Sequence, residues 1–186
     1  MTSEEIKNRL WNGAETLRGS MDASRYKDYM LGLMFYKFLS DKTLDTFRSL
    51  SGMKNATERE LIESYGQAVK EFGDKLTDSV QKVRGYYVSP EYLYQKWIID
   101  INSGEFEVQK VIDSLNKFET TIATSEESAD FKGLFSSSTL DLSDTALGSN
   151  LHERSKNIRE LILLFADLVM VALQHGDVLG NAYEYL

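Results

Sequence analysis

Few side chains in this sequence are spaced for catalysis. There is no cysteine, and the two histidines, His152 and His175, lie 23 positions apart. A chain without cysteine has no thiolate nucleophile, no disulfide and no cysteine-bound metal. His152 and Glu153 begin like the zinc motif His-Glu-x-x-His, but Lys156 stands where the second histidine would be. We therefore expect no metal site.

Pairs of neighbouring carboxylates are the other candidates for acid–base chemistry. They are Glu4 and Glu5, Glu126 and Glu127, and Asp141 and Asp144. The first pair suits the positive end of a helix dipole, and the others lie in an irregular stretch, so a structural or solvated role is favoured for all three. The sequence also has no Gly-x-Gly-x-x-Gly loop, no Walker motif and no Gly-x-Ser-x-Gly elbow. We expect no catalytic residue and no cofactor site in this chain.

Arg18, Arg25 and Lys27 are the basic side chains best placed to contact phosphate, since they cluster around the link between the first two expected helices. The net charge of −8 argues against a polyanionic partner overall. However, residues 1–50 carry eight basic and seven acidic side chains, whereas residues 51–186 carry 13 and 22. A contact with DNA would therefore use the first two helices. On the pattern alone, a solvated basic edge is the preferred interpretation.

Helices must position these candidates. From Tyr29 to Leu39 almost every residue is apolar, with interruptions at Gly32, Tyr36 and Lys37. A helix that is apolar on nearly all sides is surrounded by other helices. Eleven residues are too few to span a bilayer, which needs about 20. We therefore predict a central buried helix over residues 25–49.

Further helices must supply the walls around this one. Apolar residues recur at helical spacing over residues 4–18, 57–72, 76–83, 90–101, 105–124 and 151–172. Thr57 and Glu60 have the spacing of a capping box. Trp11, Trp97 and the tyrosines have rings suited to base stacking, but most lie on apolar helix faces, which favours core packing.

Two stretches do not read as helix. Aromatic and β-branched residues before Pro90 favour a short extended segment near residues 86–88. Residues 124–150 lack periodicity but contain several large apolar side chains, which favours a loop packed on the surface. The fold class that we predict is all-α: a multi-helix orthogonal bundle around a central buried helix, with the extended segment near residues 86–88.

Composition places the chain among ordinary globular domains. It has 186 residues, 42% hydrophobic and 27% charged, which is enough for one domain with a core. The N-terminus has neither the basic flank nor the apolar stretch of a signal peptide. Together with the absence of cysteine, this indicates a cytoplasmic protein. The chain ends inside an apolar helical pattern, so we expect the natural protein to continue past Leu186.

Several segments carry a family resemblance when they are taken in order. The first motif consists of Trp11, Ala14, Leu17, Arg18 and Gly19. The second consists of Tyr26, Lys27, Tyr29, Leu31, Gly32, Leu33, Phe35 and Lys37 to Lys42. The later ones are Leu147-Gly148, Glu153-Arg154 with the helix from Ile158 to Val169, and Asp177 to Leu186. The ordered set resembles the N-terminal region of the modification (M) subunit of type I restriction–modification systems.

This resemblance implies a single helical N-terminal domain over residues 1–186, followed by a catalytic domain that binds S-adenosylmethionine beyond Leu186. In that family the M subunit is a DNA methyltransferase that transfers a methyl group from S-adenosylmethionine to N6 of adenine. It works with a specificity (S) subunit and a restriction (R) subunit, and its N-terminal domain helps to enclose DNA. The cofactor loop and the Asn-Pro-Pro-Phe/Tyr motif are absent from this sequence, so we expect the fragment alone to be inactive.

The resemblance also changes the interpretation of the basic residues. Arg18, Lys27, Lys37 and Lys42 match charged positions of the family pattern. Within its apolar run, Lys37 must snorkel to the surface, pair with a buried carboxylate or contact phosphate, and the first two are preferred. We expect DNA contact at Arg18, Arg25 and Lys27. The alternative is a helical protein-interaction module with no direct DNA contact; a membrane partner is not expected, and a self-contained enzyme is disfavoured.

Overall fold

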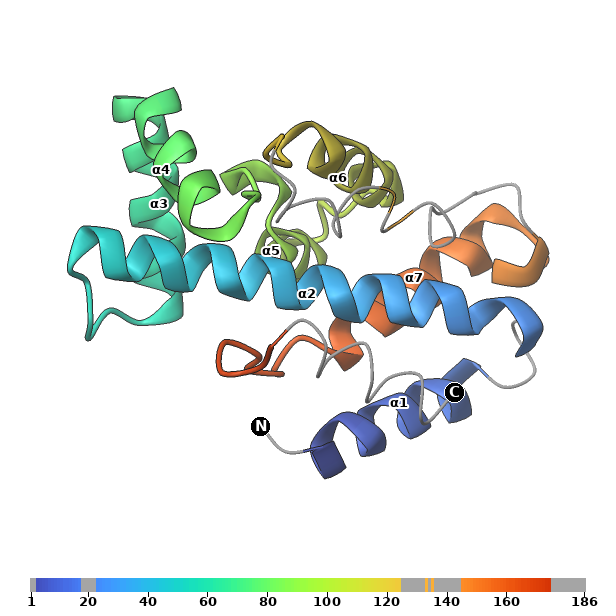
Figure 1. Ribbon diagram of the computed structural model, residues 1–186. Helices are drawn as coiled ribbons and strands as arrows, with labels where there is room; N and C mark the ends of the chain where they lie inside the picture. Colours follow the sequence, from blue (N-terminus) through green and yellow to red (C-terminus); the bar gives the residue numbers. More distant parts are fainter. Residues whose placement is uncertain (1–2, 18–22, 125–132, 134, 136–144, 175–186) are drawn as a thin grey trace.

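A computed structural model describes residues 3–17, 23–124, 133, 135 and 145–174. Over these residues the chain forms seven α-helices and no strand (Figure 1). The α-helices are α1 (Ser3–Leu17), α2 (Ala23–Ser51), α3 (Glu58–Phe72), α4 (Asp74–Arg84), α5 (Tyr94–Ser103), α6 (Val108–Thr120) and α7 (Leu151–Leu164). Two short 3-10 helices, Pro90–Tyr92 and Thr145–Leu147, lie between them. The all-α prediction is confirmed.

Helix α2 is the axis of the bundle. It runs through the middle of the molecule in Figure 1, with α3 and α4 at its C-terminal end, α5 and α6 along one side, and α1 and α7 nearer its N-terminal half. Every residue from Tyr29 to Asp41 is buried. The predicted central buried helix is therefore confirmed. Trp97 of α5 is also fully buried, and its ring stacks on Tyr36 with centroids 4.8 Å apart.

Helices α3 and α4 form a hairpin with the predicted cap. The Thr57 hydroxyl accepts from the amide of Glu60, and the Glu60 carboxylate accepts from the amide of Thr57. This reciprocal pair satisfies two amides that have no partner within the helix. Gly73 separates the two helices with a φ of 54°, a left-handed value that side chains disfavour.

The segment between α4 and α5 differs from its prediction in detail. Residues 86–89 are neither helical nor in a strand. The Val88 amide donates to the Thr43 hydroxyl of α2 at 3.2 Å, so a side chain takes the place of a strand partner. Pro90 begins a single 3-10 turn rather than the next helix, which starts at Tyr94.

Helix α7 is shorter than its apolar pattern. The pattern predicted helix to Ala172, but α7 ends at Leu164 and residues 165–174 contain no regular helix. Their backbone polar groups need partners outside a helix, and α2 supplies several of them. Among the described residues, no helix combines the length and the apolar character that crossing a membrane requires.

Candidate functional site

The basic residues proposed for DNA contact lie at the start of α2 or just before it. Arg25 and Lys27 fall in the first two turns of α2, whose backbone is described there. Arg18 falls outside the described residues, and the side chains of Arg25 and Lys27 do too. Their assignment as DNA-binding residues therefore stays a prediction.

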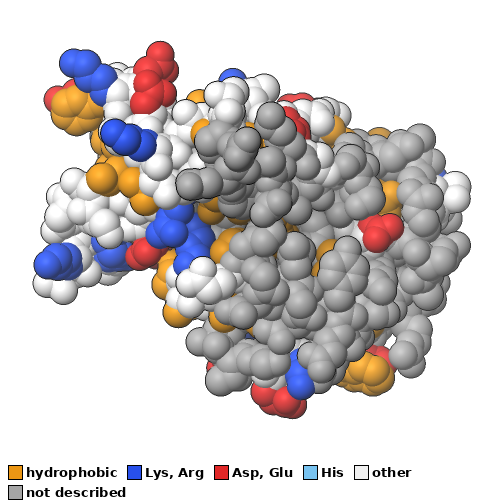
Figure 2. All heavy atoms as spheres, in the orientation of Figure 1, with side chains coloured by type: hydrophobic (Ala, Val, Ile, Leu, Met, Phe, Trp, Pro, Cys, Tyr) orange, Lys and Arg blue, Asp and Glu red, His pale blue; other side chains and the backbone are white. Residues whose placement is uncertain are grey.

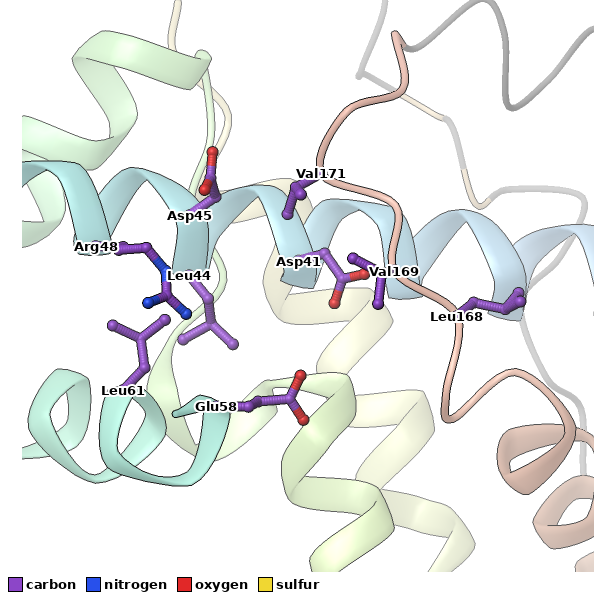
Figure 3. A pocket seen from close by; sticks show the side chains of 9 residues that line it. All are labelled: Asp41, Leu44, Asp45, Arg48, Glu58, Leu61, Leu168, Val169 and Val171. Carbon is purple, nitrogen blue, oxygen red and sulfur yellow. The ribbon is translucent and has the colours of Figure 1, made fainter. Parts of the chain in front are cut away.

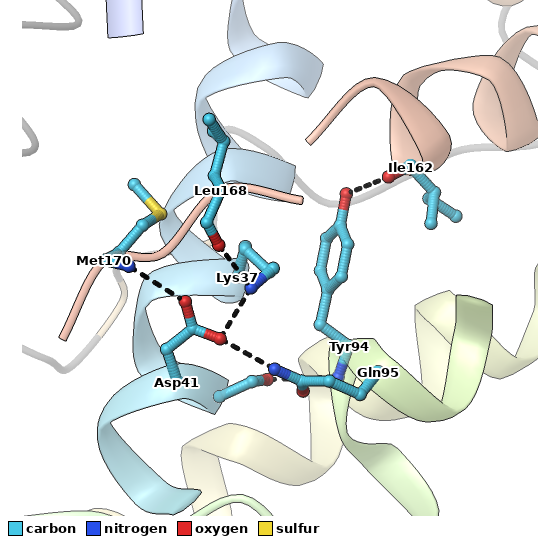
Figure 4. Close-up of polar contacts among 8 residues, drawn as sticks. Lys37, Asp41, Tyr94, Gln95, Ile162, Leu168 and Met170 are labelled. Atoms are coloured by element: carbon cyan, nitrogen blue, oxygen red, sulfur yellow. Dashed lines mark hydrogen bonds and ion pairs between the residues drawn. The ribbon is translucent and has the colours of Figure 1, made fainter. Parts of the chain in front are cut away.

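A buried ion pair lies in the middle of α2 (Figure 4). Lys37 is 1% exposed and Asp41 6% exposed, and Lys37 Nζ lies 2.6 Å from Asp41 Oδ1. The two residues are one helical turn apart, so the helix itself brings them together. Of the three roles considered for Lys37, the pair with a buried carboxylate is confirmed. Its burial excludes snorkelling to the surface.

Three further hydrogen bonds complete this polar centre. Lys37 Nζ donates to the carbonyl of Leu168 at 2.8 Å. Gln95 Nε2 of α5 donates to Asp41 Oδ1 at 2.7 Å, and the Met170 amide donates to Asp41 Oδ2 at 3.2 Å. Both charges are thus hydrogen-bonded as well as paired, which buried charges require. We call Lys37, Asp41 and Gln95 the polar centre.

Two more basic side chains hold the segment that follows α7. Lys42 of α2 donates to the carbonyl of Val171. Arg9 of α1 donates to the carbonyl of Leu164 at 2.9 Å and pairs with Asp167. With the bonds to Leu168 and Met170, side chains of α1 and α2 thus bind four backbone groups of residues 164–171. These bonds attach the end of α7 and the segment after it to α1 and α2.

A small pocket of about 150 Å³ opens beside the polar centre (Figure 3). Its walls come from α2, the start of α3 and the segment after α7. Three carboxylates line it, those of Asp41, Asp45 and Glu58, together with the guanidinium of Arg48. Arg48 Nη1 is engaged with carbonyls of the loop between α2 and α3, including that of Ala56 at 2.8 Å.

The surroundings of these groups change their proton affinities. Burial raises the pKa of Asp41 above its usual value, and the ammonium of Lys37 opposes that rise. Burial also raises the pKa of Glu58. The pKa of Lys42 is lowered, first by burial and then by the nearby guanidinium of Arg84. Among the described residues, no group of acidic or histidine side chains is arranged to hold a metal ion.

Basic side chains also gather on the surface over the C-terminal half of α2, as Figure 2 shows. Arg84 and Lys42 lie close together in this region. Arg84 donates to the hydroxyl of Thr46 at 2.6 Å and lies 3.7 Å from Asp45. Because both cations are engaged with groups of this chain, their first role is to hold α4 and the segment after α7 on α2.

Comparison with known sequences assigns this helical arrangement to a family. The sequence profile of the HsdM N-terminal domain family matches residues 6–165. The chain belongs to this family. The resemblance found in the motifs, to the N-terminal region of the modification subunit of type I restriction–modification systems, is therefore confirmed.

Two relatives of the HsdM N-terminal domain extend the comparison. One is the type I restriction enzyme MpnII methylase subunit of Mycoplasma pneumoniae, 26% identical over 191 aligned residues that cover 97% of this chain and 34% of that protein. The other is the crystal structure of a type I restriction–modification methyltransferase subunit from Streptococcus thermophilus. It superposes with a TM-score of 0.77 at 28% identity and covers 99% of this chain and 38% of that one. The chain thus spans little more than a third of either protein.

Sequence reasoning identified one member of the polar centre and missed the others. Lys37 stood out as a charge within an apolar run. Asp41 lies one turn further along, at the spacing of a helical ion pair, and this was the available signal for it. Gln95 has no such signal, because its contact with Asp41 joins residues 54 positions apart. In the HsdM N-terminal domain the polar centre is an anchor, since Lys37 and Asp41 are bonded to each other and to backbone atoms of the segment after α7.

Proposed function

We propose that the parent protein is a DNA methyltransferase that transfers a methyl group from S-adenosylmethionine to N6 of adenine. The chain described here is the helical domain that precedes the catalytic one. It contributes to enclosing DNA and to assembly with the specificity subunit, and in the full complex it works beside the restriction subunit. The parent protein acts in the cytoplasm, and the fragment alone is inactive.

The match of residues 6–165 to the family is the observation that carries this proposal. The names of both relatives, a methylase subunit and a methyltransferase subunit, support the activity of the parent protein. Binding of S-adenosylmethionine belongs in this proposal to the rest of that protein. In the helical domain, Arg18, Arg25 and Lys27 supply positive charge for the DNA backbone at the α1–α2 link.

Salt-dependent DNA binding tests the proposal. The full-length subunit, assembled with its specificity partner, should bind target DNA with a logarithmic affinity that falls linearly with the logarithm of salt concentration. Each lost phosphate contact reduces that slope by roughly one. Replacing Arg18, Arg25 and Lys27 by glutamate should therefore weaken binding and flatten the slope. Methylation of adenine in the same DNA, with labelled S-adenosylmethionine, tests the reaction separately.

Lys117→Glu is the matched control. Lys117 lies on α6 and is exposed, and its replacement changes the charge by as much as any one of the three substitutions at the α1–α2 link. Its variant should keep the wild-type slope. If the triple variant and the control behave alike, the α1–α2 link makes no direct phosphate contact.

That outcome would favour the second candidate function, a helical protein-interaction module. The charge distribution supports this alternative, because residues 51–186 carry nine more acidic than basic side chains. A module of this kind would retain binding to the specificity subunit in the triple variant, which a pull-down with the purified subunit would measure.

A further inference from the structure

A groove of about 510 Å³ is lined by residues of α3 and α5. Its apolar surface comes from Ile62 of α3 and from Ile98 and Ile99 of α5. Ile99 is 43% exposed, which is high for an isoleucine in a domain with an extensive core. All residues of the groove belong to the described part of the chain.

Gln95 lines this groove and carries a buried acceptor that has no partner among the described residues. Gln95 is 2% exposed, and its Nε2 donates a hydrogen bond to Asp41 (Figure 4). An ionised carboxylate only accepts hydrogen bonds, so this contact fixes which end of the amide faces Asp41. The other atom of the amide, Gln95 Oε1, is buried and makes no hydrogen bond to any described residue. Such an acceptor favours a ligand that brings a donor.

The charges around the groove favour a cation. Glu58, Glu63 and Arg59 of α3 all line it, which gives two carboxylates and one guanidinium. Arg59 lies 3.5 Å from Glu63, so Glu58 supplies the negative charge that this pair leaves over. Burial raises the pKa of Glu58, and the ammonium of Lys37 opposes that rise. The last turn of α5 contains no basic residue and contributes Asn102 to the groove. The C-terminal end of a helix attracts positive charge.

We propose that this groove binds an arginine side chain, next to an aliphatic residue, on a segment of a partner protein. The aliphatic residue and the arginine stem pack on Ile62, Ile98 and Ile99. The guanidinium has five donors in a rigid plane, enough to reach Gln95 Oε1 and the Glu58 carboxylate together. The proposal rests on the groove alone and requires no contact with DNA.

Isoleucine methyl resonances of the 186-residue chain provide the test. The probe is N-acetyl-leucyl-arginine amide, compared with the same compound in which citrulline replaces arginine. Citrulline keeps the stem but lacks the positive charge. The arginine probe should shift the Ile62, Ile98 and Ile99 methyl signals in a saturable way and bind about tenfold more tightly than the citrulline probe, because its hydrogen bonds are charge-assisted.

Matched variants separate charge from packing. Glu58→Gln should remove most of the preference for arginine over citrulline, whereas Glu71→Gln, a change of the same kind on the exposed side of α3, should leave it intact. Ile99→Ala should weaken both probes. Far-ultraviolet circular dichroism of each variant verifies the fold.

Three results would overturn the proposal. Equal binding of the two probes would show an apolar surface without a cation site. Equal binding of guanidinium chloride and the arginine probe would show a small-cation site. A concentration-dependent dimer in sedimentation, abolished by Ile99→Asp, would show that the groove is covered by a second copy of this chain.

Discussion

Breaking the ion pair on α2 should destabilise the domain severely. Lys37 and Asp41 are almost fully buried and lie 2.6 Å apart. Removing one member of a buried pair leaves the other charge uncompensated, which costs about 3–5 kcal/mol. Lys37→Met and Asp41→Asn keep the size of the side chains, so this loss is electrostatic rather than a cavity effect. For a chain of this length the melting temperature should fall by roughly 6–20 °C.

The two changes should be strongly coupled. In the double variant no unpaired charge remains, so its cost should be similar to that of either single variant. A double-mutant cycle measured by urea denaturation should then give a coupling energy of roughly 3 kcal/mol. The exposed pair Lys156 and Glu160 has the same spacing and is the matched control. Its variants Lys156→Met and Glu160→Gln should each cost less than about 1 kcal/mol.

Hydrogen exchange distinguishes an anchor from a general contribution to stability. The Met170 amide donates to Asp41 Oδ2, so Asp41→Asn should accelerate its exchange under native conditions. The exchange rate of an amide in the middle of α6, such as that of Leu115, should rise only by the amount that the loss of global stability explains. The pair does not hold the segment after α7 if Asp41→Asn lowers the free energy of unfolding by less than about 1 kcal/mol. The same conclusion follows if the effects of Lys37→Met and Asp41→Asn on that free energy are additive.

Two further predictions concern pH and close packing. Burial already raises the pKa of Asp41, and Lys37→Met removes the ammonium that opposes this rise. Because the folded variant then favours the protonated carboxyl, its stability deficit against wild type should grow as the pH rises above about 4, the usual pKa of an aspartate in an unfolded chain. Urea titrations at several pH values measure this deficit, and a constant deficit would contradict the burial of Asp41. A Cβ on Gly13 would stand 2.7 Å from Leu164 Cδ2, so Gly13→Val should destabilise by about 1–3 kcal/mol. For such a Cβ on Gly66, no heavy atom of the described residues lies within 4 Å, and Gly66→Ala should raise stability by about 0.5–1 kcal/mol in the same melts. Equal effects at the two glycines would refute the close approach of α1 and α7.

Local patterns predicted most of the helices and the core. The apolar run in α2 is long enough to be recognised without its partners, and the capping box at Thr57 marks the start of α3. Both signals depend on residues within a few positions of each other. Trp11 and Phe72 are exceptions among the large aromatic residues of the described chain. They are 64% and 54% exposed, although the spacing places them on or beside the apolar faces of their helices.

Contacts between distant residues explain what the sequence pattern missed. The apolar periodicity continues past Leu164, but the carbonyl of Leu168 and the amide of Met170 find partners on α2. These partners are about 130 positions away in the sequence, so no local pattern records them. Tertiary hydrogen bonds thus replace the intrahelical ones, and α7 ends earlier than its apolar residues suggest.

The polar centre fixes the segment after α7 more strictly than an apolar contact would. Apolar surfaces tolerate small shifts, because their attraction is not directional. Here Lys37 requires a carbonyl and Asp41 requires an amide, so a shift of the segment by one residue would place the wrong group opposite each charge.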